Sequence, residues 1–484
     1  MFFNSIDFAL FLPVFFILYW FVVANNLKLQ NFLIVAASYL FYGWWDKRFL
    51  FLILFSTIVD FIVGRKLRIE KNQNRRKILL WTSILINIGL LSLFKYYNFF
   101  LDNFVTAFTL FGNNIKVNSL NIILPVGISF YTFQTLSYTI DVYKRKLEPT
   151  NNFIAFSAFV SFFPQLVAGP IEKAKNLLPQ FYKKRKFDYI LAADGMRQIL
   201  WGLFKKIVIA DNCAEFANQI FDNSSNMNGS TLLLGAMFFT FQIYGDFSGY
   251  SDIAIGTSRL FGFNLVQNFN FPYFSRDVAE FWRRWHISLS NWFRDYLYIP
   301  LGGSQKGTWI KIRNTFTVFI VSGFWHGADW TFIFWGLLNA LYFLPLLILK
   351  KTKVNIDIVA KGKFLPTIKE AFQMSITFCL TLFAWIFFRA ESMGHALSYI
   401  STILSKSVLE TPQFSSLPEA KVTLLLIVIF ILVEWQGRKH QFAIEDVKSI
   451  KSKRVRWFRY TLILMAIYTN GSFDETIEFI YFQF

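Results

Sequence analysis

Two of the four histidines in this chain lie in apolar, aromatic surroundings. His326 stands in the run Val321–Trp330 (VSGFWHGADW), and apolar residues continue on both sides of it. An ionisable group in such a stretch usually faces a bundle interior or a water-filled cavity. Burial favours the neutral imidazole, which can accept a proton as the general base of an acyl transfer. A structural histidine bonded to a backbone carbonyl is the alternative, and the residue types leave both readings open. Gly323 and Gly327 leave room beside it for a substrate or a second helix.

His286 lies in a segment rich in tryptophan and arginine, FWRRWHISLSNWFRDY. Large apolar residues recur there at steps of three and four, which predicts one amphipathic helix: Trp282, Trp285, Leu289, Trp292 and Tyr296. Arg283 could hold a phosphate or a carboxylate, and Asn291 adds a polar group on the same stretch. An interfacial helix anchored to lipid headgroups explains the same pattern equally well.

A third polar group interrupts an apolar stretch at Tyr244–Gly256 (YGDFSGYSDIAIG). Asp246 and Asp252 need partners if they are buried, and an arginine from 276–294 could serve; Ser248 lies between them. Gly245 and Gly249 are spaced for close helix contact. Structural ion pairing is the favoured interpretation, since such networks perturb carboxylates without catalysis. His395 and His440 are expected to be solvated.

Composition excludes several classes of protein. Of 484 residues, 55% are hydrophobic and 62 are Phe, while 16% are charged, against roughly 25% in soluble domains. This composition excludes disorder for most of the chain. A disulfide scaffold is excluded because Cys213 and Cys379 are the only cysteines and both suit apolar packing. No zinc spacing, HExxH, GxSxG, Walker A or GxGxxG motif occurs, so a metal site, a serine hydrolase and a nucleotide-driven pump are unsupported.

The formal net charge of +19 is gathered in clusters between apolar runs, at 65–77, 144–146, 183–186 and 448–459. This is the pattern of cytoplasmic loops in a polytopic membrane protein rather than of nucleic-acid binding. The loop 65–77 should be cytoplasmic, which places Met1 outside. The basic loops 350–363 and 437–459 flank two spans, which places segment 390–419 outside, and the span 460–470 returns the C-terminus to that side. The run from Phe8 lacks a basic region and a small-residue cleavage site, so we expect a retained first helix.

Apolar runs long enough to span a bilayer recur along the chain. Candidates are 7–24, 29–45, 49–64, 78–96, 152–168, 232–244, 314–326, 331–349, 371–388, 421–434 and 457–469. The interrupted runs 119–143, 189–210 and 245–262 could be re-entrant or half-spanning pieces. The sequence predicts an all-α polytopic membrane protein with about 11–13 membrane helices, re-entrant pieces included. One integral membrane domain over 1–484 is the economical organisation.

Six segments together resemble the membrane-bound O-acyltransferase (MBOAT) family, in its bacterial branch that O-acetylates alginate and peptidoglycan. The D-alanylating teichoic-acid branch is similar. The segments are 125–134 (PVGISFYTFQ), 163–171 (FPQLVAGPI), 246–256, 281–295, 324–328 (FWHGA) and 479–484 (FIYFQF). The resemblance covers nearly the whole chain, with core motifs at about 120–345. It implies a ring of helices around a thin centre pierced by a tunnel.

The resemblance also implies roles for residues and partners. The family's catalytic histidine falls on His326 and its second polar position on His286, with Asp246, Ser248, Asp252, Arg283, Asn291 and Trp325 supporting the tunnel. Acetyl-CoA would be the donor substrate, with no tightly bound cofactor. The acetyl group would reach an extracytoplasmic polysaccharide through a separate SGNH-type partner. Membrane lipids would surround the protein in the bacterial cytoplasmic membrane, which it would cross several times.

Tyr481, in the short aromatic tail, is a candidate acyl relay, because a phenolic ester is a reactive acyl donor. An interfacial aromatic anchor is the alternative for this residue. Two other functions stay open for the chain. One is acylation of a lipid or protein hydroxyl, and the other is a transporter or flippase, since polar residues in broken helices also mark transport sites.

Overall fold

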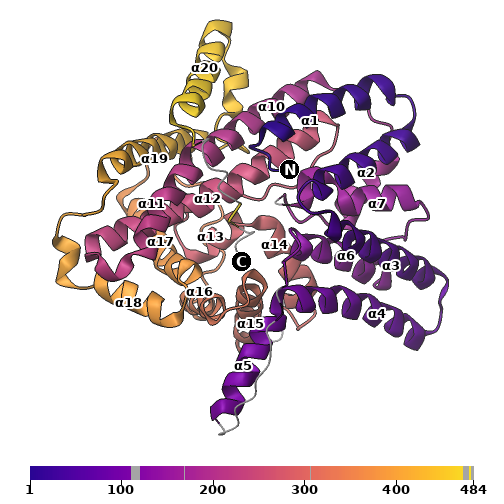
Figure 1. Ribbon diagram of the computed structural model, residues 1–484, viewed down its shortest axis with the longest axis horizontal. Coiled ribbons are helices and arrows are strands. Elements are labelled where there is room, and N and C mark those ends of the chain that lie inside the picture. Colours follow the sequence, from indigo (N-terminus) through magenta and orange to yellow (C-terminus); the bar gives the residue numbers. More distant parts are fainter. Residues whose placement is uncertain (111–119, 121, 168, 306, 473–478, 481–484) are drawn as a thin grey trace. The chain divides into compact units, whose positions relative to one another are not determined.

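Every regular element in the described part of the chain is a helix in this computed structural model (Figure 1). The structure describes residues 1–484 apart from 111–119, 121, 168, 306, 473–478 and 481–484. The predicted all-α class is confirmed. The chain divides into two compact units, Met1–Tyr189 with Leu260–Leu265, and Ile190–Arg259 with Val266–Phe484. That they form one domain, with a central tunnel, stays a prediction.

In the first unit, helices that lie apart in the sequence pack as neighbours, in indigo and violet in Figure 1. α2 (Leu27–Gly43) packs on α7 (Phe153–Ser161), and α6 (Ile128–Tyr143) packs on α3 (Leu50–Ile69) and α4 (Gln73–Leu91). The other elements are α1 (Ile6–Ile17), η1 (Leu18–Val22), η2 (Lys47–Phe49), η3 (Ser92–Tyr96), α5 (Tyr97–Leu110), α8 (Phe163–Leu166), α9 (Ala174–Leu177) and η4 (Leu178–Tyr182). The predicted runs 7–24, 29–45 and 49–64 therefore coincide with helices.

Two predicted segments of this unit have different limits. The run 152–168 is broken at Phe162, between α7 and α8. Pro164 has no backbone N–H to donate, and its ring would clash with the preceding turn of a continuous helix. The run 78–96 belongs to a longer helical stretch, Gln73–Leu110, in which η3 is a π-helical turn.

The second unit begins with α10 (Tyr189–Leu203), η5 (Phe204–Ala210) and α11 (Asp211–Asp222), followed by the long helix α12 (Gly229–Leu260). Its later helices are α13 (Val278–Arg284), α14 (Ile287–Phe293), α15 (Thr308–His326), α16 (Trp330–Ile348), α17 (Ile368–Arg389), α18 (Met393–Ile403), α19 (Leu417–Gly437) and α20 (Lys453–Asn470). Short turns are η6 (Ser224–Asn226), η7 (Pro272–Phe274), η8 (Arg294–Tyr298), η9 (Lys406–Leu409) and η10 (Glu445–Ser449).

α12 is continuous through the polar stretch at 245–256, so the expected interruption at 245–262 is wrong. The helix survives because its glycines lie against the backbone of α10 and η5. A Cβ at Gly249 would lie 2.8 Å from the carbonyl oxygen of Gly202, and one at Gly256 would lie 2.4 Å from that of Gly195. The close packing predicted for Gly245 and Gly249 is thus confirmed, and it brings η5 against the acidic part of α12.

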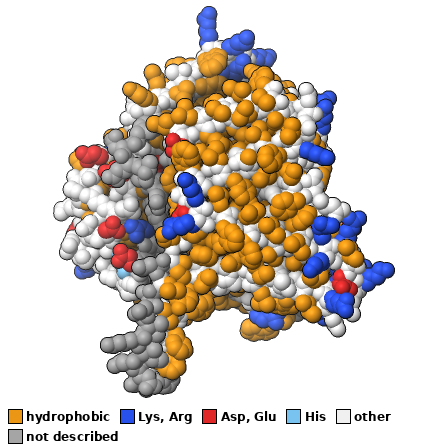
Figure 2. Space-filling view, turned by 45° about the vertical axis from the view of Figure 1, so that its right-hand side comes forward, with side chains coloured by type: hydrophobic (Ala, Val, Ile, Leu, Met, Phe, Trp, Pro, Cys, Tyr) orange, Lys and Arg blue, Asp and Glu red, His pale blue; other side chains and the backbone are white. Residues whose placement is uncertain are grey.

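Three described helices are long and apolar enough to cross a membrane by length and composition: 73–110, Trp330–Ile348 and Ile368–Arg389. Figure 2 shows a face on which hydrophobic side chains predominate, while Lys and Arg gather towards its margins. Large apolar side chains of the first unit are turned outward, among them Phe51, Ile78 and Leu85. Such surface is stable in lipid rather than in water. The predicted number of spans and their sidedness stay predictions.

Candidate active site

α15 and α16 form a helical hairpin whose backbones are in close contact. A Cβ added at Gly323 would lie 2.2 Å from the carbonyl oxygen of Phe332, and one at Gly336 would lie 2.3 Å from that of Phe319. Glycine is therefore needed at both positions, as is usual where two membrane helices cross closely. This crossing fixes the end of α15, which is His326.

His326 is the last residue of α15 and is 4% exposed. Its imidazole is enclosed by aromatic rings from three helices. The centroid distances are 4.9 Å to Trp325, 5.2 Å to Trp335 of α16 and 5.4 Å to Phe388 of α17, all at steep interplanar angles. Such edge-to-face contacts orient an imidazole in a dry site. The predicted burial of His326 among apolar residues is confirmed.

His286 lies at a break between two short helices, so the single amphipathic helix predicted for 282–296 is wrong. α13 ends at Arg284, Trp285 is extended, and His286 takes left-handed backbone angles of φ 42° and ψ 54° before α14 begins. This region is sparsely populated by residues other than glycine. The apolar period continues across the break because the aromatic side chains pack into the same core on both sides of it.

Asn268 holds this break from a neighbouring segment. Its backbone oxygen accepts the N–H of Ile287 at 2.9 Å, and its Oδ1 accepts the Ser288 hydroxyl at 2.8 Å. The same Oδ1 lies 3.1 Å from Nδ1 of His286, while Asn268 Nδ2 donates to Ser251 Oγ. Because an amide oxygen only accepts, Nδ1 of a neutral His286 carries the proton, and Nε2 is its proton-accepting nitrogen.

Trp325 connects the two histidines. Its indole centroid lies 4.9 Å from the His326 ring and 6.3 Å from the His286 ring. The structure therefore brings together three residues that the sequence singled out, from α15 and from the α13–α14 break. The site offers two imidazoles in an aromatic enclosure that limits access of water. This arrangement suits proton transfer during attack by a hydroxyl group.

Comparison with known proteins decides the family of this site. The profile of the membrane-bound O-acyltransferase family, MBOAT, matches residues 144–388, which include both histidines. A Pseudomonas aeruginosa protein named "Probable alginate O-acetylase AlgI" is 38% identical over 432 residues, which are 89% of this chain and 79% of that protein. The chain belongs to the membrane-bound O-acyltransferase family.

Two further relatives place this MBOAT protein within its family. A Helicobacter pylori protein named peptidoglycan O-acetyltransferase is 32% identical and covers 98% of this chain and 95% of its own length. A Bacillus subtilis teichoic acid D-alanyltransferase is 28% identical over 57% of this chain and 71% of the relative. The predicted family and its alginate and peptidoglycan branch are confirmed. The chain is accordingly an O-acyltransferase and a membrane protein.

The carboxylates of α12 pair with lysines of η5, not with the arginine from 276–294 that the sequence offered as a partner. Lys205 Nζ lies 2.6 Å from Asp252 Oδ2 and 2.9 Å from Ser248 Oγ. Lys206 Nζ lies 2.9 Å from Asp246 Oδ1 and 2.7 Å from Asp211 Oδ1. η5 is a π-helical turn held against α12 by the glycine contacts, which directs both lysines to the acidic face. The favoured interpretation of this stretch, structural ion pairing, agrees with these contacts.

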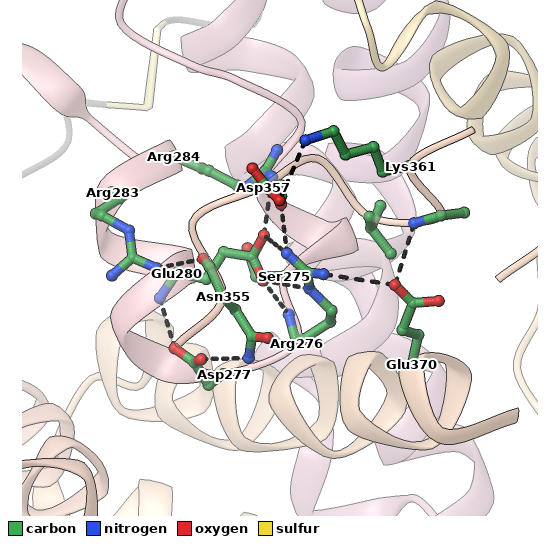
Figure 3. A network of polar contacts seen from close by, with 12 residues as sticks. Ser275, Arg276, Asp277, Glu280, Arg283, Arg284, Asn355, Asp357, Lys361 and Glu370 are labelled. Atoms are coloured by element: carbon green, nitrogen blue, oxygen red, sulfur yellow. Dashed lines mark hydrogen bonds and ion pairs between the residues drawn. The ribbon is translucent and has the colours of Figure 1, made fainter. Parts of the chain in front are cut away.

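Arg283 of the MBOAT protein bonds to the loop between α16 and α17. Its guanidinium donates to the carbonyl oxygens of Thr352 and Asn355, at 2.8 and 2.6 Å. Figure 3 shows it within a polar network that ties α13 to the loop between α16 and α17. Glu280 is the centre of that network and lies 2.8 Å from Arg284 and 3.0 Å from Arg276. A phosphate-binding role for Arg283, considered from the sequence, would compete with these bonds.

The remaining sequence candidates are dispersed. Asn291 lies half-buried on α14, and Tyr481 lies outside the described residues. His395 is half-buried rather than solvated, because it bonds Ser224 Oγ at 3.0 Å, whereas His440 is exposed as expected. Within the described ranges, no group of three or more His, Cys, Asp or Glu is placed to hold a metal ion.

Sequence reasoning missed several residues around the MBOAT site. Asn268 lies 18 residues before His286 in a segment without regular structure, and the lysines of η5 come from a more distant segment. A single sequence gives no signal of either pairing. Trp335 and Phe388 looked like ordinary residues of apolar spans. One signal was present for Lys205 and Lys206, since two adjacent cations within the apolar run 199–210 need buried partners.

Proposed function

We propose that this MBOAT protein transfers acetyl groups from cytoplasmic acetyl-CoA across the membrane, for O-acetylation of an extracytoplasmic polysaccharide. The observation that carries the chemistry is the enclosed pair His286 and His326, joined by Trp325. The acceptor class is supported by the relatives, which are named alginate O-acetylase and peptidoglycan O-acetyltransferase at 38% and 32% identity.

In this mechanism His326 takes the proton of an acceptor hydroxyl while the oxygen attacks the thioester carbonyl. The new carbon–oxygen bond forms, the carbon–sulfur bond breaks, and the departing thiolate takes the proton back from the imidazolium. CoA therefore leaves as the thiol, and the histidine returns to its starting state. The surrounding rings exclude water, which would otherwise hydrolyse the thioester.

Positive charge near the site favours an anionic donor such as acetyl-CoA. The loop between α16 and α17 carries exposed lysines and is tied to α13, which ends two residues before His286. These lysines are Lys350, Lys351, Lys353, Lys361 and Lys363. Clustered cations raise the local concentration of a ligand that bears phosphates. We therefore propose that the lysines of this loop attract the phosphates of CoA.

The finer parts of the function are proposals drawn from the family resemblance. The protein would cross the bacterial inner membrane several times and pass the acetyl group to an SGNH-type partner outside. Tyr481 would carry the acetyl group between them as a phenolic ester. A Tyr481→Phe variant that acetylates polymer at the wild-type rate would remove the relay from this scheme.

The test uses the full chain reconstituted in vesicles with acetyl-CoA labelled in its acetyl carbons. Thiol release and transfer of label are measured for wild type, for His326→Gln and for His440→Gln. His440 is the matched control because it lies exposed in a loop. We expect both signals to fall by about 10²–10⁴-fold in His326→Gln and to persist in His440→Gln.

Two outcomes favour other functions. Thiol release that His326→Gln retains in full would contradict acyl transfer at this histidine, whereas no thiol release from either protein would favour transport, which needs no cleavage of acetyl-CoA. Release that requires His326 but deposits label on lipid or protein would instead assign the acceptor to a different hydroxyl class.

A further inference from the structure

A buried carboxylate on α12 holds the chain near its C-terminal end. Asp246 is 2% exposed, and its two oxygens have different partners. Oδ1 lies 2.9 Å from Lys206 Nζ, while Oδ2 accepts the backbone N–H of Ile480 at 2.7 Å, across 234 residues of sequence. Ile480 is itself 1% exposed, so this contact lies in the core of the second unit.

Two buried carboxylates, those of Asp211 and Asp246, share the single ammonium group of Lys206. One ammonium group is balanced by one carboxylate, and Asp211 already lies 2.7 Å from Lys206 Nζ. A second buried carboxylate is unfavourable unless it gains further hydrogen bonds. The N–H of Ile480 supplies a bond of the charge-assisted kind, which is stronger than one between neutral groups.

The neighbouring Phe479 packs where the chain end meets the histidine site. Its ring centroid lies 4.6 Å from Tyr250 and 5.8 Å from Phe247. Phe247 also meets His286 edge-on, with the centroids 4.6 Å apart and the planes at 89°. Phe247 is therefore a shared wall between the docked chain end and one of the two imidazoles.

Ring contacts and the carboxylate bond act differently on this segment. An aromatic side chain in an apolar groove can slide or rotate, because hydrophobic contact is not directional. A hydrogen bond from a backbone N–H to a fixed carboxylate sets the register of the chain. The contacts of Phe479 thus bury the segment, and the Asp246 bond sets where along α12 it lies.

We propose that Asp246, with Lys206 as its counter-ion, is a positioning residue for acyl transfer, because it fixes Phe479–Ile480 in register against the Phe247 wall of the His286 site. The effect on rate rests on the proposed function, whereas the docking of the segment does not. The segment acts through Phe247 and the histidine rather than by touching the donor.

The first experiment measures the docking. In a Cys379→Ala background, which removes the exposed native cysteine, Ile480→Cys is labelled with a maleimide in the full chain. We expect Asp246→Ala to speed labelling by about 10-fold or more, as for loss of a hydrogen bond to a charged group. Asp252→Ala removes the other carboxylate of the same helix, the partner of Lys205, and also lowers stability. It is therefore the control for general loosening, and it should change the labelling rate of the folded protein far less. Equal acceleration by both variants would overturn the proposal.

The second experiment removes the donor and leaves Asp246 and Lys206 in place. Ile480→Pro lacks the N–H that Asp246 accepts. Ile480→Val keeps the N–H and is the matched comparison. With acetyl-CoA in vesicles, we expect kcat of the proline variant to lie about 10-fold below that of the valine variant, while KM stays within about 2-fold. Equal kcat values would overturn the positioning role.

Failure of the two proposals can be told apart. Labelling that depends on Asp246 in a protein that releases no thiol from acetyl-CoA supports the docking and overturns the proposed donor. Labelling that is indifferent to Asp246 in a protein that turns over acetyl-CoA overturns the docking and leaves the proposed function standing.

Discussion

The two histidines and the two lysines of the second unit are buried alike but are held differently. His326 and His286 are 4% and 1% exposed, and Lys205 and Lys206 are 3% and 1% exposed. Aromatic rings and the amide of Asn268 surround the imidazoles, whereas aspartates lie within 3 Å of each ammonium group. Ring contacts orient an imidazole in either protonation state, but an ion pair selects the charged form. The two histidines can therefore exchange protons, whereas the two lysines hold helices together.

The largest expected effect on stability comes from breaking the lysine region. Lys205→Met leaves Asp252 without its cation at 2.6 Å. Removing one partner of a buried pair costs about 3–5 kcal/mol, so thermal unfolding in detergent should occur at a clearly lower temperature. Adding Asp252→Asn should restore part of the loss, because the uncompensated charge disappears. A double variant no more stable than Lys205→Met would show that the pair is not coupled in this way.

Replacing His286 tests whether the histidine region contributes to acyl transfer rather than to stability. His286→Asn retains a side chain that tolerates the left-handed backbone at φ 42° but lacks the imidazole. We expect acyl transfer to fall by about 10²-fold if this ring takes part in proton transfer, with little change in unfolding temperature. His286→Ala adds strain of about 1 kcal/mol at the same position and should unfold earlier. Full transfer activity in His286→Asn would reduce this residue to a packing role.

The glycine crossing behind His326 gives a smaller effect. In Gly323→Ala the new methyl group would meet a backbone oxygen at 2.2 Å, which cannot move aside as a side chain can. Overpacking of this kind costs about 1–3 kcal/mol. Gly89→Ala on α4 is the control, because nothing lies within 4 Å of its added Cβ. Equal unfolding temperatures for the two variants would be inconsistent with a tight α15–α16 contact.

The smallest effect is expected at Arg283, which ties α13 to the following loop rather than to the histidines. Arg283→Ala should change kcat by less than about 3-fold, since it removes two hydrogen bonds outside the site. Trypsin should cleave the lysine-rich loop at 350–363 faster. Arg294→Ala, which removes an exposed arginine paired with Asp295, is the matched control. A large loss of turnover in Arg283→Ala alone would instead support the role in anion binding considered from the sequence.

Local pattern was sufficient for some parts of this molecule. The apolar surroundings of His326 and His286 identify both as candidate site residues, and the spacing of Gly245 and Gly249 indicates a close helix crossing. Helices over 314–326, 331–349 and 371–388 were predicted because each is a long apolar run, and they correspond to α15, α16 and α17.

Other parts depended on contacts that a single sequence does not encode locally. The break at His286 is stabilised by Asn268, and the aromatic period runs on through it, so periodicity alone predicted one helix. The polar stretch of α12 resembled an interruption because its neutralising lysines lie about 40 residues earlier in the chain. The carboxylates were therefore assigned a wrong partner, although ion pairing itself was anticipated.

The central claim is that the histidines carry the chemistry and the lysine region holds the helices. Its most direct test is single-turnover acyl transfer per folded molecule, measured side by side for wild type, His326→Gln and Lys205→Met. We expect His326→Gln to keep the wild-type unfolding temperature and to lose transfer by about 10²–10⁴-fold, and Lys205→Met to lose stability far more than transfer. Transfer at the wild-type rate in folded His326→Gln would exclude His326 as the general base.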